Sequence, residues 1–172
     1  MSNAQASAAA HLEWVQAQTP VERRLRGVRA YVVPLRGAAG FRTIPVARFS
    51  AGDEVGVDVP MLTDVWTIDG ITDEETIPIL TLPDASRRGQ RRWELYNIWF
   101  IRPRGRAMPV NQTLRYMGAT QPVTGEFIVF RKGPNTSHIL DMRREDHVRM
   151  EVALRRLVRL LYSRDFLWHG TL

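Results

Sequence analysis

The sequence contains no cysteine. This absence excludes disulfides, thiolate nucleophiles, cysteine-based zinc sites and iron–sulfur clusters. No run approaches the ~18–20 apolar residues that a membrane-spanning helix needs, and the first residues, MSNAQASAAAHLEW, lack the basic and then apolar layout of a secretory signal. We therefore expect a protein of the cytoplasm, nucleus or an organelle, or one packaged within a virion, with no membrane partner.

The motifs of several large enzyme classes are also missing. The sequence has no GxxxxGK[ST] phosphate loop, GxGxxG fingerprint, GxSxG elbow or HExxH metal motif. His147 and Glu151 have a metal-ligand spacing on a helix face, but such a pair more often forms a surface salt bridge. Five aspartates could in principle hold two divalent cations, although acidic turns explain them more simply: Asp53, Asp58, Asp64, Asp69 and Asp73. We expect a non-enzymatic protein without a metal or cofactor.

Lysine is nearly absent as well. The chain has 24 basic residues, a net charge of +6 and a pI near 10.6, and Lys132 is its only lysine. A GC-rich genome would explain this bias. Arginine also makes planar, bidentate contacts with phosphate and stacks on bases, which lysine cannot do. Both explanations stay open at this stage.

The charge is unevenly distributed along the chain. Residues 53–84 carry nine acidic residues and no basic residue, and this segment either folds onto the chain's own arginines or faces a partner. Within residues 87–106, two arginine pairs flank a Gly-Gln turn in SRRGQRRW, and RPRGR follows. This pattern is typical of a hairpin tip and a strand end that face phosphate or an acidic protein. The expected contacts with nucleic acid or an acidic partner are Arg87, Arg88, Arg91, Arg92, Arg102, Arg104 and Arg106.

The 172 residues fit a single domain of the α+β class. Residues 1–30 are expected to form an N-terminal helical arm, because Thr19-Pro20-Val21-Glu22 is a capping box that should start a helix reaching about Ala30. Short runs rich in Val, Ile and aromatic residues fill residues 31–132 and predict a central antiparallel β barrel or sandwich. The runs are YVVPL, FRTIPVARF, EVGVDV, DVWTIDGI, TIPILTL, RWELYNIWFI, QTLRYM and EFIVFR. Prolines in or beside these runs should confine strands to edges or shorten them.

Residues 133–172 are expected to hold an amphipathic helix and a docking tail. The helix should run from about Asp141 to Ser163, with an apolar face formed by Met150, Ala153, Leu154, Leu157 and Leu161. The tail RDFLWHGTL is too apolar to remain in water. We expect contacts with the sheet or with other subunits through residues near both termini: Leu12, Trp14, Phe166, Leu167 and Trp168.

Aromatic residues are concentrated in WELYNIWF. Because strand residues alternate between faces, Trp93 and Trp99 should lie on one side and Tyr96 and Phe100 on the other. This density predicts a strand covered by layers on both faces. The alternative is a recognition surface that stacks on bases or holds a methylated cation, with Trp66, Tyr96 and Trp99 as its candidate residues.

Residues 41–131 also resemble the bromo-adjacent homology (BAH) domain. The similarity follows the order of FSAGDEVGVDVP, MLTDVWTIDG, ELYNIWFIRPRG, NQTLRYMG and TGEFIVF. The resemblance implies a β-rich chromatin reader that binds nucleosomes, sometimes through methyl-lysine. Trp99 matches the cage tryptophan of that family, whereas Ile101 stands where a second aromatic residue is usual.

Together these patterns predict a structural or interaction subunit of a nucleoprotein or other large assembly. Its arginine clusters would contact nucleic acid or acidic surfaces, and its apolar ends would contact other protein subunits or further copies of the chain. A self-assembling capsid or other virion protein and a BAH-like chromatin reader are the alternatives.

Overall fold

A computed structural model describes residues 24–49, 56–67, 71–81, 92–102, 109–120, 122–133 and 138–169. The strands are β1 (Arg24–Val33), β2 (Gly40–Phe49), β3 (Val57–Pro60), β4 (Ile71–Leu80), β5 (Trp93–Arg102), β6 (Phe127–Lys132) and β7 (Ile139–Leu140). The helices are α2 (Gln112–Tyr116), the short 3-10 helix η2 (Arg144–Asp146) and α3 (His147–His169).

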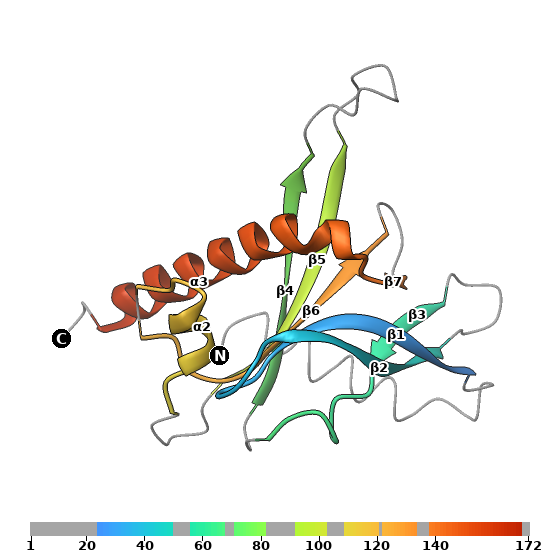
Figure 1. Cartoon of the computed structure of the whole chain (residues 1–172), viewed down its shortest axis with the longest axis horizontal. Helices are drawn as coiled ribbons and strands as arrows, with labels where there is room; N and C mark the ends of the chain where they lie inside the picture. Colours follow the sequence, from blue (N-terminus) through green and yellow to red (C-terminus); the bar gives the residue numbers. More distant parts are fainter. Residues whose placement is uncertain are drawn as a thin grey trace.

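The strands form one antiparallel sheet in the order β3-β2-β1-β6-β5-β4, with β7 paired to β6. This order joins two meanders, β1-β2-β3 and β4-β5-β6, through the pairing of β1 with β6. Figure 1 shows the sheet as an open half-barrel, with α3 running across it and the far ends of β4 and β5 projecting beyond the helix. The prediction of a mostly antiparallel sheet with a C-terminal helix is therefore confirmed, in the form of an open half-barrel.

Two apolar clusters lie on opposite faces of the sheet. The first lies beneath α3 and combines residues of both meanders with the helix, including Tyr31, Tyr96, Phe100, Phe127 and Leu154. The second lies on the other face and is covered by the segment after β3. Its buried residues include Val28, Val32, Ile44, Val46, Leu62, Ile128, Phe130 and Ile139, and Trp66 and Trp99 lie at its margin. Strand β5 contributes to both clusters, so the prediction that it is covered on both faces is confirmed.

The amphipathic character of α3 matches the predicted periodicity. Met150, Ala153, Leu154 and Leu157 are buried, and Leu161 packs against the same cluster. Residues 144–146 form η2 rather than the first turn of the α-helix, because the Asp146 carboxylate accepts a 2.8 Å hydrogen bond from the Arg143 backbone.

The expected helix up to Ala30 is wrong from Arg24 onward, where the chain forms β1. This strand pairs with β2 over nine residue pairs, from Arg24 with Arg48 to Val32 with Gly40. Alternate side chains, Val28, Ala30 and Val32, are buried in the second cluster. At Gly27 a Cβ atom would lie 2.7 Å from Thr43 Cγ2, so glycine lets the two strands approach. Tertiary pairing overrides the local capping signal, whose residues lie outside the described part.

Two predicted strands are also wrong. Residues 63–65 form a turn after β3 and Thr67 lies in a bend. The buried Glu126 holds this segment by accepting hydrogen bonds from Thr67 N and Thr67 Oγ1, both at 2.7 Å. Residues 112–116 of QTLRYM form α2, because the Asn111 side chain accepts a 2.8 Å hydrogen bond from Leu114 N and caps the helix.

Pro45 and Pro78 lie within strands. Pro78 lies on β4, an edge strand, as expected. Pro45 lies on β2, an interior strand, which is an exception to the prediction. Its carbonyl accepts a 2.8 Å hydrogen bond from Met61 N, just beyond the last residue of β3. The side of Pro45 that lacks an N–H is therefore directed to the end of β3, where strand pairing stops and no donor is needed.

Among the described residues, no helix is long and apolar enough to span a membrane. Leu12 and Trp14 lie outside the described part of the chain, and so do the side chains of Phe166, Leu167 and Trp168, whose backbone continues α3. The expected assembly contacts of both ends therefore remain predictions.

Candidate nucleic-acid interface

The antiparallel topology gathers basic side chains at one end of the sheet. Strands β1 and β5 begin at this end, and β2 and β6 finish there, because Arg24 pairs with Arg48 and Leu95 pairs with Lys132. The described basic side chains at this end are Arg26, Arg48, Arg92, Arg131, Lys132, Arg143, Arg144 and Arg149, accompanied by the acidic side chains Asp58, Glu94, Asp141, Glu145 and Asp146. They come from segments that are distant in sequence, and only the sheet brings them together.

A buried carboxylate, Asp58, organises one half of this end. Its side chain has no exposed surface. Oδ2 accepts hydrogen bonds from Arg26 Nη2 at 2.7 Å and from Ile139 N at 2.8 Å, and it lies 3.5 Å from His138 Nδ1. Arg26 also donates to the carbonyl of Ile139. Asp58 therefore fixes β1 against β7 and holds a guanidinium at the surface.

His138 extends the cluster outward to Arg48. Its Nε2 lies 3.2 Å from Arg48 Nη2, and since a guanidinium only donates, Nε2 is the acceptor. Arg48 is exposed and makes no ion pair with another described residue, so its charge is directed to solvent.

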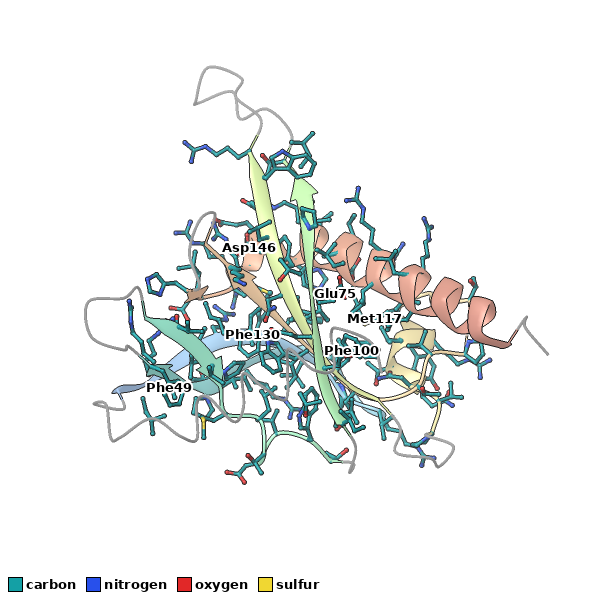
Figure 2. The ribbon with its side chains drawn as sticks, turned by 180° about the vertical axis from the view of Figure 1, so that it is seen from behind. Phe49, Glu75, Phe100, Met117, Phe130 and Asp146 are labelled. Atoms are coloured by element: carbon teal, nitrogen blue, oxygen red, sulfur yellow. The ribbon has the colours of Figure 1, made fainter. Side chains whose placement is uncertain are left out.

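A second network neutralises charges in the other half of this end. Arg149 Nε lies 3.1 Å from Glu94 Oε2, and Arg149 Nη2 lies 3.4 Å from Asp146 Oδ1. Arg131 reaches the same two carboxylates at 4.0 and 3.6 Å. Figure 2 labels Asp146 at the start of the helix, beside the sheet. The network ties α3 to β5 and β6 and leaves little net charge.

This network also perturbs the groups within it. Burial, followed by the charges of Glu94 and Asp146, raises the pKa of Tyr96, whose hydroxyl donates to Glu94 Oε2 at 3.0 Å. Burial, the largest single influence, lowers the pKa of Arg149, but Glu94, Tyr96 and Asp146 together outweigh it and raise the pKa of that guanidinium. Tyr96, Arg131 and Arg149 are therefore structural residues that are already engaged within the protein.

We define the candidate site, called the basic end, by four of these cations and the adjoining His138. The cations are the exposed Arg26, Arg48 and Arg92 and the half-buried Lys132. Lys132 pairs with Leu95 on one side and with Ile139 on the other, so the site continues from the start of β5 to the Asp58 cluster. Arg92 is exposed just before β5, where its backbone donates to Thr81 Oγ1 at 3.0 Å.

The structure separates the arginines that the sequence grouped together. Arg92 lies at the base of the connection between β4 and β5, and Arg87, Arg88 and Arg91 lie outside the described residues. Arg102 is the last residue of β5, about 30 Å away along a ten-residue strand, and Arg104 and Arg106 lie outside the described residues. Arg92 and Arg102 therefore lie at opposite ends of β5.

The three candidate aromatic residues do not form one surface. Tyr96 is fully buried on the α3 face. Trp99 lies on the opposite face, packs against the second cluster and donates its indole N–H to Asn97 Oδ1. Trp66 also packs there, and its buried indole nitrogen has no partner among the described residues. Trp93, which was not a candidate, is 57% exposed at the basic end.

The expected salt bridge between His147 and Glu151 has a 3.9 Å separation, one helical turn apart. The imidazole Nε2 also lies 3.3 Å from the Tyr31 hydroxyl, and the two rings pack edge to face. Burial and the charge of Glu151 raise the pKa of Tyr31. Among the residues that the structure describes, no group of three His, Asp or Glu side chains could hold a metal ion.

Sequence reasoning missed Arg26, Arg48, Asp58 and His138 as a group. They lie on four different segments, and no spacing along the chain signals their proximity. In comparisons with known proteins, no family model, no curated protein and no solved structure matches this chain.

Proposed function

We propose that the protein is a non-enzymatic nucleic-acid-binding subunit of a larger nucleoprotein assembly, and that the basic end is its contact surface. The observation that supports this proposal is the gathering of Arg26, Arg48, Arg92 and Lys132 at one end of the sheet. Phosphate backbones are recognised by clusters of cations at a protein surface, and guanidinium groups can bind them bidentately.

The carboxylates at this end do not cancel its charge. Glu94 and Asp146 are engaged by Arg131 of β6 and Arg149 of α3. Asp58, whose side chain is buried, binds the guanidinium of Arg26. Arg48, Arg92 and Lys132 have no ion pair within the described part of the chain. Their charges are therefore available to an anionic ligand.

The dimensions of the basic end suit a polymer rather than a single small anion. Its residues lie on β2, β1 and β6 and directly before β7 and β5, with β7 beside β6 on the side of β1. At about 4.8 Å between neighbouring strands, the site extends over about 20 Å. Several successive phosphates of one strand can occupy this length.

Exposed valines on α3 favour a place within an assembly. Val148 is 70% and Val152 is 41% exposed, one turn apart on the outer side of the helix. A neighbouring subunit would remove these side chains from water.

The test is a binding titration of a fluorescent 20-nucleotide single strand and a 20-base-pair duplex, followed by anisotropy at several salt concentrations. The double variant Arg48→Ala/Lys132→Ala should lose about tenfold or more in affinity at low salt. Its slope of log K against log salt should fall by about 1.4 for the single strand, since each phosphate contact contributes about 0.7.

The matched control is Arg36→Ala/Arg115→Ala, which removes the same charge from exposed residues at the opposite end of the sheet. It should weaken binding much less. Equal losses in both double variants would show that binding follows net charge alone and would refute the assignment of the site. No binding by the wild-type protein at low salt would refute the function.

A further inference from the structure

The exposed Trp93 distinguishes this surface from a simple row of charges. It is the first residue of β5 and pairs with Leu80 of β4, which is itself 40% exposed. Figure 1 shows this end of the β4–β5 pair projecting beyond α3. Among the described residues, the Trp93 indole has no hydrogen-bond partner. The ring is therefore unlike that of Trp99, which the second cluster and Asn97 hold in place.

Strand alternation places Trp93 on the same face as the cations of the basic end. Trp93 and Leu95 share a face, and Lys132 is the cross-strand partner of Leu95. Trp93 and Lys132 are thus diagonal neighbours, with Cβ atoms about 7–8 Å apart. Lys132 in turn pairs with Ile139, whose backbone contacts Asp58 and Arg26. An aromatic plane and a row of cations therefore lie side by side.

We infer that Trp93 stacks on an unpaired base while Lys132 and the neighbouring arginines hold the phosphates, so that the ligand is single-stranded nucleic acid. This inference rests on the proposed function. A duplex presents phosphates but keeps its bases stacked on one another, whereas a single strand offers the face of each base to an aromatic side chain. The cations can bind the phosphate of a nucleotide, and the exposed tryptophan beside them can stack on its base.

The experiment compares a labelled dT20 strand with a 20-base-pair duplex for the wild-type protein and three variants. Trp93→Ala should lower the affinity for dT20 by about tenfold or more, since the stacking of one base has an effect of this size. Its affinity for the duplex should change less than twofold. Trp93→Phe, which keeps a ring, should restore part of the dT20 affinity.

Two controls separate stacking from other effects. Leu80→Ala removes the cross-strand partner of Trp93 and should lower dT20 affinity far less than Trp93→Ala, whereas equal losses would show that the hairpin end merely needs to be ordered. Tyr116→Ala removes an aromatic side chain that is 89% exposed on α2, away from the basic end, and should have no effect. As a direct readout, dT20 should quench tryptophan emission in the wild-type protein, and this quenching should largely disappear in Trp93→Phe.

The outcomes separate this inference from the proposed function. Equal loss of strand and duplex affinity in Trp93→Ala, or no loss in either, would overturn the stacking role. If the Arg48→Ala/Lys132→Ala variant still weakened binding in that case, the proposed function would stand. A wild-type protein that binds neither ligand would overturn both.

Discussion

The substitution Asp58→Asn should weaken the fold and strengthen nucleic-acid binding. Asp58 is fully buried, and its Oδ2 accepts hydrogen bonds from Arg26 and from the backbone of Ile139. An amide oxygen can still accept from Ile139, so the main loss is the charge in the contact with Arg26. Hydrogen bonds to charged groups contribute about 1.5–3 kcal/mol. Because the Arg26 side chain is 42% exposed and water competes, we expect the free energy of unfolding to fall by about 1–2 kcal/mol.

Binding should change in the opposite direction, because the same substitution releases a guanidinium at the surface. Without its carboxylate partner, Arg26 can contact a phosphate, and one additional contact steepens the salt dependence by about 0.7 for a single strand. The affinity at low salt should rise several-fold. Urea unfolding gives the stability change, and anisotropy titrations over a series of salt concentrations give the binding change.

Glu126→Gln is the matched control for this prediction. Glu126 is also a buried carboxylate, but it holds Thr67 at the opposite end of the sheet. The control should lose stability with little change in salt dependence. Weaker binding by a folded Asp58→Asn protein would refute the reasoning, because it would show that Asp58 positions Arg26 for the ligand instead of competing with the ligand.

Three further predictions concern the fold itself. The pKa of Tyr96 is raised from 10.0, so the unfolded chain loses this proton first. The free energy of unfolding should stay constant up to about pH 10 and then fall by about 1.4 kcal/mol per pH unit for this group; Tyr96→Phe should remove that part of the fall in urea titrations. Asn111→Ala leaves the backbones of Leu114 and Gly125 without their side-chain partner, and should cost about 2–4 kcal/mol in thermal unfolding. Leu154→Ala opens a cavity beneath α3 and should cost about 2–5 kcal/mol by urea unfolding, with the exposed Val152→Ala as control.

The parts of the fold that could be predicted are those with a strong local period. The apolar spacing of α3 repeats over several turns, and its buried residues are those of the predicted face. The alternation in WELYNIWF likewise predicted which side chains of β5 share a face. In both cases one short segment carries the whole signal.

The errors arose where contacts with distant residues decide the conformation. The segment LRGVRA has apolar residues at positions that suit either a helix or a strand, and only its pairing with β2 selects the strand. In QTLRYM, the apolar residues suggested a strand, but Asn111 just before the segment caps a helix.

The candidate site depends even more on distant contacts. Arg26, Arg48, Asp58 and His138 meet because β2 pairs with both β1 and β3 in a particular register, and because the segment after β6 returns beside β1. A shift of one residue in any of these pairings would direct the side chains to the other face. Composition indicated a basic protein, but register decides which cations are neighbours.

The division of the sheet into two meanders has a consequence for how the chain folds. Each meander is built from consecutive strands, so each can form by closing loops shorter than the one that the seam closes, the longest being residues 103–126 between β5 and β6. The seam between them consists of three residue pairs, and one of these joins Tyr31 to Val129, about a hundred residues apart. On a ribosome, the first meander would emerge with Tyr31 and Val33 uncovered, and would wait for β6 and then α3 before this face is covered. We expect the slow step of folding to be the docking of two preformed halves, and nascent chains that end before α3 to depend on chaperones.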